Sequence, residues 1–309
     1  MSEEAGSTGG LEGLVAAVYA RRCRVWSGGR LWECTIAARL LRGGRLVVGD
    51  RVTLMPQPDG TAVVSELLPR QSLLVRPRAD RSRRGPAAGQ VLAANVALLA
   101  IVAAIRSPPY RIGLVERFLV AAAKAGLRPL VVLTKLDLDE GGEFAQLERE
   151  LTAIGVPVLG TRLDRPDTLT PLKQALAGSI NALVGHSGVG KTSLINAIAD
   201  TELAVSEVNP KRDRGRHTTS TARLIPLPGE GWVIDSPGVR EFGLDDITPA
   251  DLAAYFPGMA PHLGRCAFGD CLHHTEGRCG VREAVEAGEF PEARYRGYLK
   301  LLEELEQAP

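Results

Sequence analysis

The hydrophobic pattern divides the chain into three parts. From residue 14 to residue 68, short apolar stretches alternate with Gly, Pro and Asp turns, a spacing typical of a small all-β barrel. From residue 91 onward, near-continuous apolar runs such as VALLAIVAA and PLVVLTK alternate with helical segments, as buried parallel strands and crossover helices do. After residue 245 the chain becomes polar and helical, and it ends in an amphipathic helix over residues 292–307.

These changes of pattern predict a multidomain chain. At 309 residues, it is about twice the usual length of a single domain, so more than one core is expected. We expect an all-β barrel over residues 1–75, a basic linker over residues 76–90, an α/β domain over residues 91–245 and a mostly helical domain over residues 246–309.

Charge is unevenly distributed along the chain. The net charge is only +1, yet residues 14–57 hold eight Arg against Glu33 and Asp50, and residues 69–86 hold six Arg against one Asp. The N-terminal part should therefore carry a positive field. No stretch reaches the roughly 20 apolar residues of a membrane span, and the first residues are acidic where a signal peptide would be basic. We expect a cytoplasmic protein without membrane contact.

A phosphate-binding loop follows directly on the apolar strand INALV, because the run GHSGVGKT and the helical SLINAIA after it have the P-loop spacing. Gly185 and Gly190 let backbone N–H groups converge on phosphate oxygens at a helix N-terminus. Lys191 would neutralise the β- and γ-phosphates, and Thr192 offers a hydroxyl to Mg²⁺. For His186, we favour a structural or solvent-facing role over a contact with the nucleotide. The predicted nucleotide contacts of this loop are Gly185, His186, Ser187, Gly188, Val189, Gly190, Lys191, Thr192 and Ser193.

Two further motifs indicate a guanine nucleotide bound with Mg²⁺. Asp235 ends the apolar run WVID and supplies a carboxylate for the ion, and Gly238 stands where a backbone N–H can meet a γ-phosphate. After the strand PLVVL, the carboxylate of Asp137 can accept two hydrogen bonds from guanine, a donor pair that adenine lacks. Lys135 would lay its stem over the base. The predicted base-reading residues are Thr134, Lys135, Leu136 and Asp137.

The order of these motifs is permuted. In an ordinary small GTPase the base-reading motif follows the P-loop, whereas here Asp137 precedes Gly185 by about fifty residues. We therefore predict a circularly permuted P-loop GTPase domain of the α/β class. The segment TLTPLKQALAG supplies the link that a permutation needs, with Thr170 as N-cap, Pro171 at the first helical position and Gly178 as C-cap.

The interval between the P-loop and Asp235 is expected to hold a switch segment. GTPases keep here the loop that closes over Mg²⁺ and γ-phosphate, and the run NPKRDRGRHTT is polar and contains Gly, as an order–disorder switch would be. Thr218, or failing that Thr219, is the expected ligand of the ion. The predicted Mg²⁺ ligands are Thr192, Thr218 and Asp235.

The water-orienting Gln of many GTPases is absent from its usual place. The residue after Gly238 is Val239, and a hydrophobic side chain cannot orient water. His217 is the nearest candidate in sequence, with a solvated loop histidine as the equally weighted alternative. The predicted catalytic residues are His217, Lys191 and Thr218.

A cluster of Cys and His in the C-terminal part predicts a structural zinc site. Three thiolates and one imidazole would make its closed tetrahedral ligand set, namely Cys266, Cys271, His273 and Cys279. His274 is a competing ligand. Cys23 and Cys34 lie on apolar strands of the predicted barrel, where we expect them to be small buried hydrophobic residues.

The motif order, the loop GRHTT and the terminal cluster together resemble the RsgA (YjeQ) family of small-ribosomal-subunit-dependent GTPases over nearly the whole chain. The resemblance implies an oligonucleotide-binding (OB) type of barrel, a permuted GTPase and a zinc domain, with one zinc per chain and Mg²⁺ bound with GTP. The family's spacing favours His273 over His274 as the ligand. Two positions depart from the usual GTPase pattern: Thr134 replaces Asn, whose longer side chain braces the P-loop, and Gly160-Thr161 replaces the Ser-Ala pair near the guanine oxygen.

The expected function is enzymatic. We expect hydrolysis of GTP to GDP and phosphate by a monomer, stimulated by the small ribosomal subunit and its rRNA and serving late maturation of that subunit. The alternative is an RNA-binding assembly module whose nucleotide site only stabilises the fold, which predicts no multiple turnover even with subunits present. A protein- or metal-handling GTPase lacks support, because it would leave the basic barrel unused.

Overall fold

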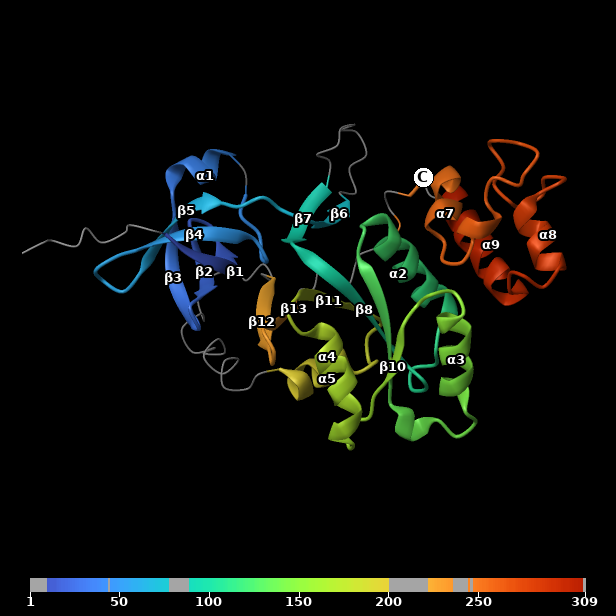
Figure 1. The fold of residues 1–309 in the computed structure, drawn as a ribbon, viewed down its shortest axis with the longest axis horizontal. Helices are drawn as coiled ribbons and strands as arrows, with labels where there is room; N and C mark the ends of the chain where they lie inside the picture. The colour runs from blue at the N-terminus through green and yellow to red at the C-terminus, as the bar shows by residue number, and fades with distance from the viewer. Residues whose placement is uncertain are drawn as a thin grey trace, which may run out of the picture.

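The computed structural model describes residues 10–43, 45–77, 89–199, 222–235, 244 and 247–307. Along its longest axis lie a β-barrel, an α/β domain and a helical C-terminal module (Figure 1). None of the helices in this described part of the chain is long and apolar enough to cross a membrane. The central portion of the predicted linker, residues 78–88, falls outside the described residues.

The N-terminal part is a closed five-stranded barrel, as predicted. Its strands are β1 (Leu11–Tyr19), β2 (Arg22–Ser27), β3 (Arg30–Ile36), β4 (Arg51–Pro56) and β5 (Ala62–Leu67), and the short helix α1 (Ala38–Gly43) follows β3. Their order is β1-β2-β3-β5-β4, closed by antiparallel pairing of β4 with β1, and only β3 and β5 pair in parallel. Cys23 and Cys34 are cross-strand neighbours in the barrel core and are buried, which confirms their predicted packing role.

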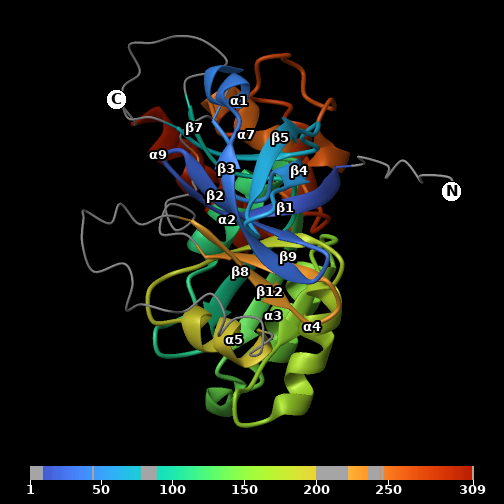
Figure 2. The ribbon, with the colours of Figure 1, turned by 90° about the vertical axis from the view of Figure 1, so that its left-hand side faces the viewer.

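A short antiparallel ribbon of β6 (Leu73–Pro77) and β7 (Gly89–Ala94) connects the barrel to the α/β domain. The barrel packs on that domain near its sheet edge, where the rings of Trp26 and Trp232 lie 5.7 Å apart. Strand β12 (Arg223–Leu227) lies beside β1 in Figure 1 and in Figure 2, and the two strands are in contact.

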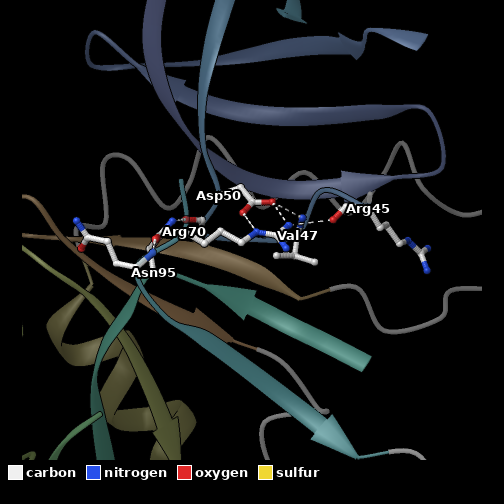
Figure 3. Close-up of polar contacts among 7 residues, drawn as sticks. Arg45, Val47, Asp50, Arg70 and Asn95 are labelled. Atoms are coloured by element: carbon white, nitrogen blue, oxygen red, sulfur yellow. Dashed lines mark hydrogen bonds and ion pairs between the residues drawn. The ribbon is translucent and has the colours of Figure 1, made fainter. Parts of the chain in front are cut away.

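An ion pair between a buried aspartate and a partly exposed arginine fastens the barrel to the segment that leaves it (Figure 3). Asp50 is fully buried, and its carboxylate accepts hydrogen bonds from Arg70 Nε at 2.7 Å, Arg70 Nη2 at 2.8 Å and the Val47 N–H at 2.8 Å. Asn95, at the start of the α/β domain, donates from Nδ2 to the Gly49 carbonyl at 2.8 Å. Side chains on both sides of the ribbon therefore bind the same barrel turn.

The α/β domain is built on a six-stranded sheet in the order β10-β9-β8-β11-β13-β12. Every neighbouring pair is parallel except β12 and β13. The further strands are β8 (Val96–Ala104), β9 (Arg128–Thr134), β10 (Val158–Gly160), β11 (Ile180–Val184) and β13 (Gly231–Asp235). This order places β11, the strand before the P-loop, between β8 and β13.

Helices cover both faces of this sheet, which explains why its strands are apolar without alternation. On one face, Leu99 and Ile101 of β8 belong to a core with α2 (Ile112–Lys124) and α3 (Glu143–Thr152). On the other, Leu98 and Ala100 belong to a core with α4 (Thr170–Leu176) and α5 (Lys191–Ile198). The 3₁₀ turns η1 (Leu136–Leu138) and η2 (Pro166–Leu169) precede α3 and α4.

The permutation link forms the predicted helix, but both of its caps lie one residue earlier than predicted. Thr170 is not the N-cap, because η2 runs directly into α4 and makes Leu169 the residue before the helix, with no side-chain cap. Pro171 is the second residue of the helix rather than the first, and it still lies in the first turn. Gly178 follows the C-cap residue Ala177 with a φ of +64°, the left-handed conformation that ends many helices.

The C-terminal module consists of α7 (Pro249–Tyr255), the turn η4 (Ala260–His262), α8 (Gly280–Glu286) and α9 (Glu292–Glu306). Its core contains Phe256, Phe290, Tyr298 and Leu301, together with Val120 from α2 of the GTPase domain. The predicted terminal amphipathic helix is α9. Helices α7 and α9 both contact α2, beside which they are drawn in Figure 1.

Candidate nucleotide site and metal site

The P-loop adopts a backbone path that requires glycine. Gly185 has a φ of +146°, and a Cβ there would lie 2.1 Å from the Val102 carbonyl oxygen of the adjacent strand β8. Gly188 and Gly190 also have positive φ, and Gly190 immediately precedes α5. The loop can therefore turn sharply from β11 into the N-terminus of α5, where backbone N–H groups are free to bind an anion.

A pocket of about 690 Å³ opens over this loop. The ammonium of Lys191 donates to the carbonyls of Gly185 at 2.7 Å and His186 at 2.6 Å, so it lies across the loop. His186 is exposed, and its Nδ1 lies 2.8 Å from the Ser187 carbonyl oxygen. Val189 is buried and does not line this pocket. The other predicted P-loop residues line it, namely Gly185, His186, Ser187, Gly188, Gly190, Lys191, Thr192 and Ser193.

Thr134 bonds directly to the P-loop. It ends β9, is buried, and donates from Oγ1 to the Val189 carbonyl at 2.6 Å. The sequence predicted weaker bracing than asparagine gives, because threonine is shorter. The close approach of β9 to the loop brings the hydroxyl within hydrogen-bonding distance of the loop backbone.

Lys135 makes a second link between the base-reading turn and the P-loop. Its backbone has a φ of +59°, and its ammonium donates to the Gly188 carbonyl at 2.9 Å and also to the Ser107 carbonyl. Leu136 and Asp137 follow in η1, and Asp137 is exposed. Two motifs about fifty residues apart in sequence are therefore held together by adjacent side chains.

Gly160 and Thr161 support the same turn. A Cβ at Gly160 would lie 2.3 Å from Leu136 Cδ1, so only glycine leaves room for that side chain. Thr161 is buried, and its carbonyl accepts a hydrogen bond from the Leu136 N–H at 3.4 Å. The departure from Ser-Ala thus fits the packing of Leu136, which sets the path of the backbone leading to Asp137.

Asp235 ends β13, which pairs in parallel with the P-loop strand β11, and it is exposed. Other residues predicted for the γ-phosphate and switch region lie outside the described residues, namely His217, Thr218, Thr219, Gly238 and Val239. Two pocket-lining residues escaped the sequence prediction, Leu114 and Phe118 of α2. No motif marks them, because they look like ordinary apolar positions of an amphipathic helix.

The Cys/His cluster has the dimensions of a tetrahedral metal site. Its four ligand atoms, from Cys266, Cys271, His273 and Cys279, lie within 4.8 Å of one another. His273 Nδ1 lies 3.4, 3.5 and 3.4 Å from the three sulfurs, and the sulfurs of Cys266 and Cys279 are 3.9 Å apart. Ideal tetrahedral Zn–S and Zn–N bonds place sulfur about 3.5 Å from nitrogen and about 3.8 Å from sulfur. The donor set therefore fits zinc.

Burial shifts the pKa values of two ligands of this cluster in opposite directions, and hydrogen bonds from α9 hold its backbone. Burial lowers the pKa of His273, which favours the neutral imidazole that a metal binds, and raises the pKa of the Cys271 thiol to about 12, so a thiolate there needs a cation beside it. His274 is exposed and is not part of the cluster. From α9, Tyr295 and Tyr298 donate hydroxyl hydrogen bonds of 2.7 Å to the carbonyls of His273 and Leu272.

The strand order, the central P-loop and the predicted base-reading turn that precedes it in the chain define a circularly permuted P-loop GTPase. The chain belongs to the RsgA family: a family model described as RsgA GTPase matches residues 67–245. The small ribosomal subunit biogenesis GTPase RsgA of Moorella thermoacetica is 38% identical over 297 residues, which make up 96% of this chain and 97% of that protein. The protein of the same name from Ectopseudomonas mendocina is 40% identical over 284 residues, which make up 90% of this chain and 79% of that protein.

Solved structures show the same architecture. The crystal structure of YjeQ from Thermotoga maritima superposes with a TM-score of 0.77 at 30% identity, over 97% of this chain and 99% of that one. The crystal structure of YloQ, described as a circularly permuted GTPase, gives a TM-score of 0.76 at 25% identity, over 100% of this chain and 99% of that one. The predicted fold class is therefore confirmed.

Proposed function

We propose that this GTPase acts in late maturation of the small ribosomal subunit and that the subunit stimulates its hydrolysis of GTP. The observation that carries the nucleotide assignment is the pair of hydrogen bonds from Thr134 and Lys135 to the P-loop backbone. They hold a guanine-reading turn and a phosphate-binding loop in one rigid unit. The names of the relatives, which describe small ribosomal subunit biogenesis GTPases, support the assignment of the partner.

In this proposal each site residue has a stated role. Asp137 accepts the guanine hydrogen bonds, and the P-loop backbone with Lys191 binds the phosphates. Mg²⁺ is held by Thr192 of the loop and by Asp235, in the second case through water, and Thr218 is the proposed switch ligand. The cluster around His273 binds one structural zinc ion. His217 remains the proposed water-orienting group, on the basis of its place in the sequence.

The barrel offers a basic surface that suits rRNA. Arg22, Arg39 and Arg42 are exposed, and the Arg30 guanidinium stacks 3.6 Å from the centre of the Trp32 ring. Basic side chains next to an aromatic ring are typical of surfaces that bind the phosphates and bases of RNA. This barrel surface would dock on the subunit through interactions that weaken steeply with salt.

The decisive experiment measures phosphate release with and without purified small ribosomal subunits. We expect the subunits to raise the turnover number by roughly tenfold or more, because they supply or order the group that positions water. Lys191→Ala should lose activity in both conditions, whereas His217→Ala should lose mainly the stimulated part and still bind GTP and subunit. If subunits at low salt leave the turnover of the unaltered chain unchanged, the ribosomal proposal is wrong, and the RNA-binding module becomes the better account.

A further inference from the structure

A charged contact is buried between the GTPase domain and the C-terminal module. Glu116 of α2 is fully buried, Arg294 of α9 is 4% exposed, and Arg294 Nη1 lies 3.7 Å from Glu116 Oε1. Within the described part of the chain, neither carboxylate oxygen of Glu116 nor the Nε of Arg294 has a hydrogen-bond partner. Well-packed apolar residues of similar volume often stabilise such a contact as well or better, so stability alone does not explain these charges.

The surrounding residues hold the two charges face to face. A Cβ at Gly297 of α9 would lie 2.0 Å from Glu116 Oε2, so only glycine lets α9 approach α2 this closely. The Arg294 guanidinium lies 5.3 Å from the centre of the Phe256 ring, and its Nη2 donates to the Pro257 carbonyl at 3.4 Å. Arg294 is therefore fixed in the core of the C-terminal module and presents its charge to α2.

Each of the two helices also contacts one candidate site: α9 contacts the metal cluster, and α2 lines the phosphate pocket. Tyr295 and Tyr298 of α9 bind the backbone of the metal loop, so α9 and the metal cluster move together. Leu114 and Phe118 of α2 line the phosphate pocket. Glu116 lies about 200° around the helix from either of them, so the phosphate pocket and α9 contact opposite sides of α2.

The polar groups in this contact complement one another without bonding. Tyr110, just before α2, has a buried hydroxyl with no partner among the described residues, and its ring lines a small apolar cavity beside the P-loop. Burial is the main cause of a raised pKa at Tyr110, and the Glu116 carboxylate raises it further. Burial also raises the pKa of Glu116 to about 7, although the nearby Arg294 lowers it. A charge-assisted hydrogen bond needs the 3.7 Å separation to close to about 2.9 Å. A small shift of α9 on α2 can therefore strengthen the contact.

We propose that Glu116 and Arg294 are positioning residues that transmit docking of the metal-binding module to the phosphate pocket. This inference rests on the proposed subunit-stimulated function. When a docked subunit shifts α9, the ion pair closes into hydrogen bonds and α2 follows. The wall of the phosphate pocket formed by Leu114 and Phe118 then moves with it and favours hydrolysis.

The test replaces the ion pair by apolar residues in the double variant Glu116→Leu, Arg294→Met. Because apolar residues can pack in this contact, we expect unchanged zinc content, and GTP affinity and basal turnover within about twofold of the unaltered chain. The turnover number at saturating small subunits should fall by about fivefold or more, since the contact no longer has two arrangements. Arg117→Gln is the matched control, because it removes an exposed ion pair with Glu304 in the same interface, and it should keep full stimulation.

Each outcome decides between accounts. Full stimulation of the double variant would show that the pair is only structural and would overturn the inference. Weaker subunit binding with an unchanged saturated turnover number would overturn it as well, because the pair would then serve docking alone. If the double variant does not fold, Gly297→Ala tests the same contact by displacing α9 without changing a charge, and the same loss is expected. No stimulation of the unaltered chain would instead refute the proposed function, and this inference with it.

Discussion

Thr134 and Lys135 are adjacent in sequence, and their side chains bind neighbouring carbonyls of the P-loop. The hydroxyl of Thr134 binds the carbonyl of Val189, and the ammonium of Lys135 binds that of Gly188. The threonine bond is buried and the lysine bond is exposed. Because a buried carbonyl that loses its donor has no water to replace it, the threonine bond should matter more for the shape of the loop. Lys135 can exchange its bond with solvent at little cost.

We predict that Thr134→Val weakens GTP binding by roughly tenfold, since an unpartnered buried carbonyl costs about 1–3 kcal/mol and the P-loop can relax away from β9. Titration with a fluorescent GTP analogue would measure this change. Thr134→Ser keeps the hydroxyl and serves as the control, with an expected affinity within about twofold of the unaltered chain. Equal affinities for the valine and serine variants would show that this bond does not shape the loop.

At the scale of elements, α9 organises the C-terminal module around its metal loop. Two tyrosine hydroxyls of this helix bind the loop backbone, and the loop in turn brings three sulfurs and one imidazole together. The loop between η4 and α8 contains no helix or strand of its own. A metal ion bound by the cluster would therefore contribute much of the folding free energy of this segment.

We predict that His273→Ala abolishes zinc binding and loosens the C-terminal module, while GTP affinity stays within about twofold because the P-loop is built on another core. Metal analysis combined with limited proteolysis would detect both effects. His274→Ala is the matched control, since this neighbouring histidine is exposed and outside the cluster. Loss of zinc from the His274 variant and its retention in the His273 variant would reverse the ligand assignment.

Elements with strong periodic or motif signals could be predicted from the sequence. The unbroken apolar run of β8 indicated a strand covered on both faces, and the glycines of the P-loop indicated a turn into a helix. The start of α4 could not be predicted, because the preceding 3₁₀ turn displaces the cap from Thr170. The role of Glu116 was also hidden, since a charged residue on an amphipathic helix suggests exposure, and its partner Arg294 is far away in the chain.

At the scale of the whole molecule, the Asp50–Arg70 ion pair links the barrel to the connecting segment (Figure 3). Asp50 is fully buried, and its carboxylate accepts hydrogen bonds from Arg70 and from one backbone N–H. Removing the arginine would leave a buried carboxylate without its counterion. The barrel turn would then lose its side-chain link to the segment before the ribbon and keep the link from Asn95.

We predict that Arg70→Met destabilises the barrel by about 3 kcal/mol, the usual cost of leaving one partner of a buried ion pair uncompensated. Thermal or denaturant unfolding followed by the fluorescence of the barrel tryptophans would measure this loss. Arg51→Met removes an exposed pair with Glu12, 3.1 Å apart, and should cost about 1 kcal/mol or less. Equal effects of the two substitutions would mean that the Asp50 pair does not fasten the barrel.

The strand order has a mechanical consequence. Strand β8, which continues from the barrel through β7, and strand β13, which leads toward the C-terminal module, lie on either side of β11. All three run parallel, so tension between the two outer modules pulls β8 from its N-terminal end and β13 from its C-terminal end. Such tension loads the hydrogen bonds on both sides of β11 in shear, all at once rather than one after another. A molecule held at both ends by a large partner would therefore carry the strain across the strand that precedes its P-loop.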